Sequence, residues 1–266
     1  PVVAGRMIHE LARGIALGAG EILLKGFRSP GLTVSYKGVS NPVTSADRES
    51  EDFLYGRIRE RFPDHGIVAE EGSRAEGGGE FLWYVDPLDG TTNYAHGVAH
   101  FSVSIGVFSK SENRVVAGIV YDPCRRELFS ALAGGGAFLN GEGIHVSASD
   151  DLSRSLIATG FPYDKNISDK NNLSQFNRIL PRVQCVRRFG SAALDLCYVS
   201  AGRFDAYWEM KISPWDVAGG CLIVEEAGGV ITRFNGEPYD INFPEVLAAG
   251  PRLHPFFLDL LADGQD

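Results

Sequence analysis

The stretch WYVDPLDGTTNYAHG, residues 83–97, places Asp86 and Asp89 three positions apart at the end of an apolar run. Pro87 fixes its own φ and stiffens the turn between the two carboxylates. The Gly-Thr-Thr of residues 90–92 then opens a predicted helix, whose first amides have no intrahelical acceptor and can bind phosphate. Two interpretations are open. The stretch is an ordinary polar turn, since Asp-Pro and Asp-Gly pairs are common in turns, or it is a site that holds cations beside a phosphate group.

The functional interpretation follows from where the carboxylates stand. Asp86 ends the buried strand predicted for residues 81–85, so its side chain would emerge at the edge of a sheet. Asp89 can turn back toward Asp86, and the turn exposes the Leu88 carbonyl as a third oxygen. Hard divalent cations prefer such oxygen ligands, and magnesium takes only a few carboxylates. Cation ligands beside an anion-binding helix start are what metal-assisted attack on phosphate requires.

Composition and net charge limit the classes of molecule that the protein is expected to bind. The 266 residues, 44% of them hydrophobic, suffice for one large domain or two fused ones. A net charge of -9 argues against binding to nucleic acids or membrane surfaces, because such proteins use basic patches. Phosphorylated small molecules remain compatible with it, since a bound metal supplies local positive charge. No apolar run approaches the roughly 18 residues that cross a bilayer.

Compartment is inferred from the N-terminal segment and the cysteines. Residues 1–26 carry charged side chains among the apolar ones, so they are not typical of a signal peptide. The sequence begins at Pro1 without a methionine, which leaves residues upstream of it open. The four cysteines show no C-x-x-C spacing and are expected to be reduced thiols. We therefore expect a cytoplasmic protein.

The spacing of apolar residues predicts the helices and strands. Ile8, Leu11 and Ile15 recur at steps of three and four, as on one face of an amphipathic helix. Strands and helices arrive in blocks, which favours a layered α+β or mixed α/β fold over strict βαβ alternation. The predicted helices cover residues 8–26, 45–62, 166–180, 190–202, 213–229 and 253–261. The predicted strands cover residues 32–36, 66–72, 81–85, 100–108, 114–123, 127–134, 136–141, 203–210 and 246–250.

Other acids outside the opening stretch also have two interpretations. Thr44 precedes Asp47 by three positions and Ser213 precedes Asp216 by three, the spacing of a helix capping box. Asp216 can therefore be a cap or a member of the cation site, and Asp47 can be a cap or a catalytic residue. Glu70, in the predicted strand-end sequence GIVAEEG, is either a solvated loop acid or a further ligand.

Five segments together resemble the inositol monophosphatase family, and they appear in the family's order. Because they span nearly the whole chain, the resemblance is far more specific than a lone D-x-x-D. It implies a single domain, residues 1–266, folded as an α-β-α-β-α sandwich of the inositol monophosphatase and fructose-1,6-bisphosphatase type. Its N-terminal α+β half would cover about 1–145 and its C-terminal α/β half about 146–266. The segments are NPVTSAD (41–47), VAEEG (68–72), DPLDGTTN (86–93), GSAALDLCYVSAGRFDAYWE (190–209) and WDVAGGCLIVEEAGG (215–229).

The resemblance implies two or three Mg²⁺ ions. Glu70, Asp86 and the Leu88 carbonyl would hold the first. Asp86 would bridge to a second ion, completed by Asp89 and Asp216. A third, weaker ion would lie near Glu70.

The same resemblance assigns catalytic and substrate-binding roles. Thr91 with Asp47 would activate the attacking water, so that Asp47, Glu70 and Thr91 form the catalytic set. Lys37 would lie close to the phosphate and Glu209 would bind ring hydroxyls. Their structural interpretations stay open: a solvated strand-end lysine and a surface acid. The implied substrate-binding residues are Lys37, Asp89, Gly90, Thr91, Thr92, Gly190, Ser191, Ala192, Glu209 and Asp216.

The implied activity is hydrolysis of a small phosphate monoester, foremost inositol-1-phosphate, by direct attack of a metal-activated water. Fructose-1,6-bisphosphatases and 3′-phosphoadenosine 5′-phosphate phosphatases share the fold and remain alternatives. Residues 160–170 replace a rim loop that the resemblance does not assign. An interaction protein of the transcription machinery with residual phosphatase activity is an alternative of another class. The resemblance also implies a lithium-sensitive homodimer that acts on a phosphorylated polyol or sugar, without nucleic-acid or membrane partners.

Overall fold

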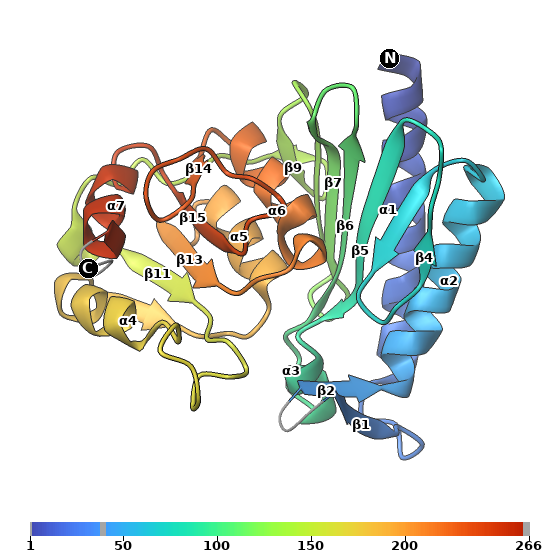
Figure 1. Ribbon diagram of the computed structural model, residues 1–266, viewed down its shortest axis with the longest axis horizontal. Helices are drawn as coiled ribbons and strands as arrows, with labels where there is room; N and C mark the ends of the chain where they lie inside the picture. The colour runs from blue at the N-terminus through green and yellow to red at the C-terminus, as the bar shows by residue number, and fades with distance from the viewer. Residues whose placement is uncertain (1, 38–40, 263–266) are drawn as a thin grey trace.

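Five layers, helices alternating with sheets, make up the molecule (Figure 1). A computed structural model describes residues 2–37 and 41–262. The predicted α-β-α-β-α sandwich is therefore confirmed, with two helices outside each sheet and two helices between the sheets.

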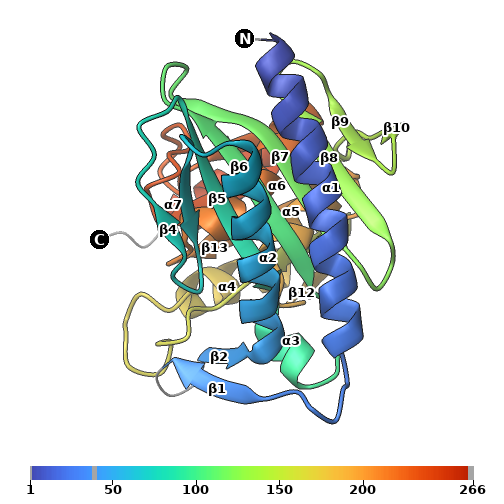
Figure 2. The same ribbon diagram turned by 90° about the vertical axis from the view of Figure 1, so that its right-hand side faces the viewer.

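The first outer layer consists of α1 (Val2–Gly26) and α2 (Ser45–Arg61), which cover one face of the larger sheet (Figure 2). Apolar side chains of both helices, such as Ile15 and Leu54, are buried against the strands. That sheet has eight strands in the order β10-β9-β8-β7-β6-β5-β3-β4. Their bounds are β3 (Gly66–Ala69), β4 (Arg74–Ala75), β5 (Phe81–Asp89), β6 (Ser102–Ser109), β7 (Arg114–Asp122), β8 (Glu127–Leu132), β9 (Ala137–Leu139) and β10 (Glu142–Gly143).

The smaller sheet has five strands in the order β12-β11-β13-β15-β14. The outer helices α4 (Leu173–Ile179) and α7 (His254–Ala262) bury an apolar core with it that includes Trp208 and Phe257. The strand bounds are β11 (Leu156–Thr159), β12 (Cys185–Arg187), β13 (Ala206–Met210), β14 (Val230–Thr232) and β15 (Glu245–Ala249).

Helices α5 (Ala192–Ser200) and α6 (Pro214–Glu226) form the middle layer and pack against both sheets. Glycines let α6 approach the larger sheet at backbone contact. Gly106 and Gly118 are register partners on β6 and β7. A Cβ at Gly118 would lie 2.5 Å from the Gly219 oxygen, and one at Gly219 would lie 2.7 Å from the Ile105 oxygen. We call Gly106, Gly118 and Gly219 the glycine seat of α6.

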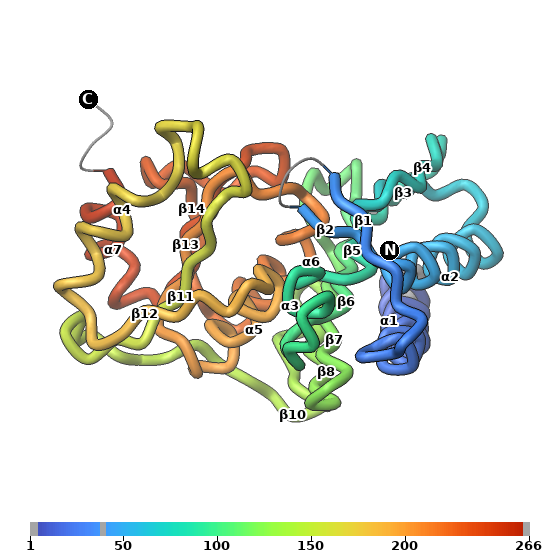
Figure 3. Tube along the Cα trace, turned by 90° about the horizontal axis from the view of Figure 1, so that it is seen from below, coloured from blue at the N-terminus to red at the C-terminus, as the bar shows by residue number. Residues whose placement is uncertain are grey.

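Short elements close the lower end of the layers (Figure 3). Strands β1 (Val34–Lys37) and β2 (Asn41–Thr44) pair antiparallel, and β2 packs against α3 (Thr91–Ala95). The turns η1 (Leu152–Arg154) and η2 (Leu180–Arg182) are single 3₁₀ segments. Along the described chain, none of the helices is both long enough and apolar enough to cross a bilayer.

All predicted helices and strands are present, with ends shifted by a few residues except in the helix predicted for 166–180, which covers only α4. Sequence analysis missed β2, β4, β10, β11, β12 and β14, which have two to four residues each. Such strands are too short to show an alternating pattern, and pairing with neighbours defines them.

The glycine seat yields a stability prediction. Gly219→Ala would press a methyl group into the backbone of β6, so we expect the free energy of unfolding to fall by about 1–3 kcal/mol. Gly56→Ala is the matched control, because Gly56 lies exposed inside α2 with no atom within 4 Å of an added Cβ. There the helix should gain about 0.5–1 kcal/mol. Urea unfolding of both variants measures the difference, and a stabilised Gly219→Ala would contradict a tight seat.

Candidate functional site

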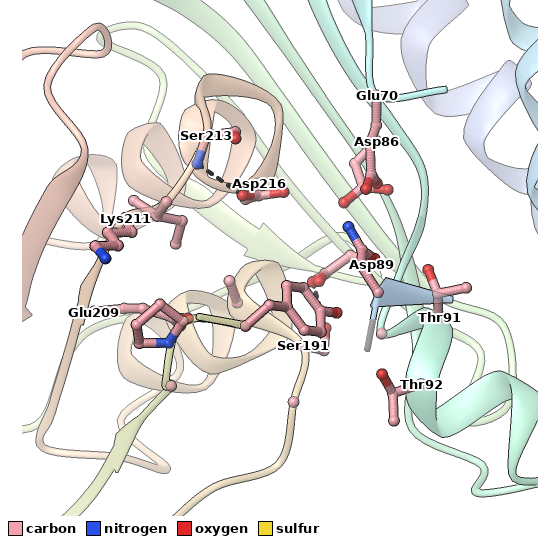
Figure 4. A pocket seen from close by; sticks show the side chains of 18 of the residues that line it. Glu70, Asp86, Asp89, Thr91, Thr92, Ser191, Glu209, Lys211, Ser213 and Asp216 are labelled. Carbon is pink, nitrogen blue, oxygen red and sulfur yellow. Dashed lines mark hydrogen bonds between the residues drawn. The ribbon is translucent and has the colours of Figure 1, made fainter. Parts of the chain in front are cut away.

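A cavity of about 370 Å³ opens where the ends of β3 and β5 face the N-termini of α5 and α6 (Figure 4). Both sheets and the middle helices therefore contribute side chains to it. Of the residues predicted for the site, all line this cavity except Asp47. Those that line it are Lys37, Glu70, Asp86, Leu88, Asp89, Gly90, Thr91, Thr92, Gly190, Ser191, Ala192, Glu209 and Asp216.

A bulge in β5 places the two carboxylates of the DPLD stretch on one side of the sheet. The strand does not end at Asp86, as the sequence analysis expected, but continues to Asp89. Residues three apart in a regular strand point to opposite faces. Here Asp86 pairs with Ser104 and Asp89 with Ser102, so three steps on β5 match two on β6. The extra residue restores the common face.

Glu70 reaches the same place from the neighbouring strand. Strands β3 and β5 are parallel, with Ala69 opposite Val85, so Glu70 and Asp86 follow at the same edge. The buried carboxylate of Glu51 on α2 holds the turn that follows, because it accepts hydrogen bonds from the amides of Glu71 at 2.7 Å and of Ser73 at 2.8 Å.

Asp216 approaches from the opposite side, as the third residue of α6. One of its oxygens, Oδ2, accepts a hydrogen bond from the Ser213 amide at 2.8 Å, so the capping interpretation is correct. The aspartate also faces the sheet: Glu70, Asp86 and Asp216 each offer one oxygen, and these three atoms lie within 4.8 Å of one another. We call these three residues the acidic trio.

The acidic trio fits a hard divalent cation. Burial and the neighbouring carboxylates raise the pKa of Asp86 and of Asp216 well above the usual range. Burial likewise raises the pKa of Glu70 to about 7. Among the described residues, the cation paired with this trio is Lys37, whose Nζ lies 3.7 Å from Glu70. Asp86 is buried and Glu70 and Asp216 are half-buried. Three such carboxylates facing one lysine need further positive charge, and their hard oxygens are the ligands that Mg²⁺ prefers.

Asp89 stands beside the trio and is held by α5. Its Oδ2 accepts hydrogen bonds from the Ser191 hydroxyl at 2.5 Å and from the Ala193 amide at 2.8 Å. Burial nevertheless raises the pKa of Asp89 to about 6. Ser191, predicted to contact substrate, is thus also the N-cap of α5 and the anchor of Asp89.

Asp47 lies behind Thr91, fully buried at the start of α2. Its Oδ2 accepts from the Thr44 amide at 2.9 Å, which confirms the capping interpretation. Its Oδ1 lies 3.1 Å from Thr91 Oγ1, which is also 3.0 Å from the Leu88 carbonyl oxygen. Asp47 therefore reaches the cavity through the threonine hydroxyl.

Glu209 lines the far end of the cavity from β13, so the surface-acid interpretation is wrong. The Tyr207 hydroxyl donates to its carboxylate, and burial raises the pKa of Glu209 to about 7. Gly160 makes room for this group, since a Cβ there would lie 2.1 Å from Glu209 Oε2.

Lys37 also lines the cavity, but it is not simply solvated. Its Nζ donates to Glu71 Oε1 at 2.6 Å, and 39% of the side chain is exposed. The predicted contact with phosphate would therefore compete with this ion pair.

Sequence analysis missed several cavity residues because long-range packing brings them there. The unassigned loop 160–170 contributes Gly160 to Tyr163, and Lys211 ties it down through Asp164 at 2.6 Å and Ser168 at 2.7 Å. Glu51, which holds the turn after β3 but does not line the cavity, left a sequence signal, since it lies four residues after Asp47 on the same face of α2. The other cavity residues that were missed are Asn41, Arg188, Asp195, Ile212, Ser213 and Trp215.

Comparisons with known proteins agree with this geometry. The profile of the inositol monophosphatase family matches residues 6–265. The Nus factor SuhB of Pseudomonas aeruginosa is 43% identical over 233 residues, 85% of this chain and 85% of that protein. The inositol-1-monophosphatase of Synechocystis is 43% identical over 221 residues, 83% of this chain and 76% of that protein. The crystal structure of the extragenic suppressor protein suhB from Bartonella henselae superposes with a TM-score of 0.90 at 35% identity, covering 97% of this chain and 99% of that one.

The two roles of Asp216 can be separated by mutation. In Asp216→Asn the amide oxygen can still cap α6, so the metal-free protein should lose about 1 kcal/mol or less. The rise in melting temperature that Mg²⁺ gives the unchanged protein should disappear, together with phosphatase turnover. Calorimetry with and without Mg²⁺ provides both numbers.

Asp151→Asn is the matched control, because Asp151 caps η1 at the exposed surface. It should keep the full response to Mg²⁺. An Asp216→Asn variant that still responds to Mg²⁺ would reduce Asp216 to a cap.

Proposed function

The chain belongs to the inositol monophosphatase family, and from this premise we propose that it hydrolyses inositol-1-phosphate to inositol and phosphate. That it is a phosphoric monoester hydrolase follows from the family; the substrate and the residue roles are our proposal. The observation that carries it is one cavity with two ends. The acidic trio stands at one end and the half-buried Glu209 at the other.

We assign the acidic trio, Asp89 and the Leu88 carbonyl to two or three Mg²⁺ ions. Bound there, magnesium would offset the charge of these carboxylates and would supply electrostatic stabilisation of the phosphoryl group. Asp86 is central to the assignment, because the bulge of β5 places it next to both Glu70 and Asp89.

Thr91 and Asp47 are the proposed proton-accepting pair. Thr91 Oγ1 donates to Asp47 Oδ1, so it can take a proton from the attacking water while it passes its own proton to the Asp47 carboxylate, where the proton ends. Asp47 stays in place because Thr44 holds its other oxygen. The first amides of α3, next to Thr91, are free to bind phosphate oxygens. Lys37 adds positive charge at the same end of the cavity.

The alcohol part of the substrate would then extend toward Glu209, Ser191 and Ala192. A carboxylate accepts hydrogen bonds from adjacent hydroxyls, which a cyclic polyol offers and a short glycerol chain offers less. On the same family resemblance we propose a cytoplasmic homodimer. Turnover of inositol-1-phosphate, fructose-1,6-bisphosphate, 3′-phosphoadenosine 5′-phosphate, histidinol phosphate and glycerol-2-phosphate with Mg²⁺ tests the choice of substrate.

A transcription-associated role is the second candidate, because a relative 43% identical to this chain carries the name Nus factor SuhB. The chain retains the full set of acids that hydrolysis needs, so a partner role would exist beside catalysis. Asp86→Asn separates the two functions. It should nearly abolish phosphate release while the fold, followed by circular dichroism, stays intact. If loss of that residue left hydrolysis unchanged, the metal-dependent mechanism would be wrong.

The role of Glu209 predicts a change in substrate preference. Hydrogen bonds to a charged group are worth about 1.5–3 kcal/mol. Glu209→Ala should therefore lower kcat/KM for inositol-1-phosphate roughly tenfold to a hundredfold. Glycerol-2-phosphate should lose much less, and the Mg²⁺ requirement should stay the same.

Glu245→Ala is the control for this experiment, since Glu245 is a strand glutamate of the same sheet outside the cavity. It should leave the ratio of the two kcat/KM values unchanged. Equal losses on both substrates in Glu209→Ala would mean that Glu209 supports the site's structure and does not read the polyol.

A further inference from the structure

Asp195 is a buried carboxyl group that the proposed mechanism does not use. It lies on α5, is 2% exposed and lines the cavity. Its Oδ1 is buried without a hydrogen-bond partner. Within residues 2–37 and 41–262, no side chain or amide donates to this oxygen.

The missing partner distinguishes Asp195 from the other buried aspartates of the cavity. Asp86, Asp89 and Asp216 each accept a hydrogen bond from a backbone amide. Burying a carboxyl group without a donor is costly, and the neighbouring Leu194 and Leu196 show that α5 is otherwise apolar at this depth. An apolar residue at position 195 would remove this cost. The function of the carboxyl group should therefore involve a ligand that enters the cavity.

Its surroundings select the class of ligand. The charged groups that act on Asp195 are Glu209, Asp89 and Arg188, and the acidic trio is not among them. Asp195 therefore belongs with Glu209 and Asp89 and not with the acidic trio. With two further carboxyl groups nearby, an anion would be repelled. Hydroxyl groups, which donate hydrogen bonds and carry no charge, match a surface of acceptors.

We propose that Asp195 is a specificity-determining residue that, together with Glu209, accepts hydrogen bonds from hydroxyl groups of the substrate's polyol. The inference rests on the proposed function, because it assumes a polyol phosphate in this cavity. It adds a second acceptor, on α5, to the one on β13. Two acceptors on different elements fix the relative positions of the two hydroxyls that they bind. A single carboxylate fixes these positions less strictly.

The test compares Asp195→Ala and Asp195→Asn with the unchanged protein on inositol-1-phosphate and glycerol-2-phosphate. Asp195→Ala should lower kcat/KM for inositol-1-phosphate about tenfold or more, and glycerol-2-phosphate less than about threefold. Asp195→Asn retains a carbonyl acceptor and should recover part of the loss. Because no hydrogen bond within the protein is lost, the melting temperature of the metal-free variants should stay the same or rise.

Deoxy analogues of inositol-1-phosphate identify the hydroxyl concerned. One single-deoxy analogue should lose about tenfold with the unchanged protein and show no further loss with Asp195→Ala. Asp205→Ala is the control: Asp205 lies outside the cavity and its carboxylate accepts from the Leu156 amide at 2.8 Å. That variant should be less stable with an unchanged substrate ratio.

Each remaining outcome decides against the inference. Equal losses on both substrates would make Asp195 a structural residue, and unchanged kinetics would leave it without a role in recognition. An unchanged protein that hydrolyses glycerol-2-phosphate but not inositol-1-phosphate would instead overturn the proposed function. The two failures are therefore told apart by the unchanged protein alone.

Discussion

Backbone contact between α6 and the larger sheet is the constraint on which the site depends. Asp216 stands near the start of α6, whereas Glu70 and Asp86 stand on the sheet, so the acidic trio exists only if the helix comes close. A side chain at any position of the glycine seat would push the helix away by the width of a methyl group or more. The same helix packs on the smaller sheet, so its position also sets the distance between the two ends of the cavity.

The glycine seat lets α6 bring together carboxylates that repel one another. Carboxylates that are buried and close to one another have raised pKa values, because burial and mutual repulsion both disfavour ionisation. The apolar cores on both sides of the middle layer supply the stability that keeps these groups in place before a cation arrives. Packing within the layers thus stabilises the fold, whereas the carboxylates in the cavity repel one another. A bound metal would reduce this repulsion and leave the packing unchanged.

Sequence reasoning succeeded where the information is local. The spacing of the two capping aspartates and the paired carboxylates of DPLD are read within a few residues. Asp86, Asp89 and Asp216 line the cavity, and Asp47 reaches it through Thr91. It failed where the information is carried by distant segments. Nothing near Asp195 in sequence says that its carboxyl group will lack a donor. Likewise, the short strand β11 exists only because β12 and β13 pair with it. The bulge that places Asp86 and Asp89 on one face depends on the register with β6 and could not be predicted from the turn alone.

Two aspartates show that a structural and a functional interpretation need not exclude each other. A carboxylate has two oxygens. In Asp47 and Asp216 one oxygen accepts from the backbone at a helix start, which fixes the side chain and leaves the other oxygen for Thr91 or for a cation. The cap therefore orders the proposed functional group before the substrate binds, and the entropy of holding it is already lost on folding. Asp195 lacks such an anchor. Its rigidity comes only from burial on α5, and its Oδ1 has no donor within the described protein.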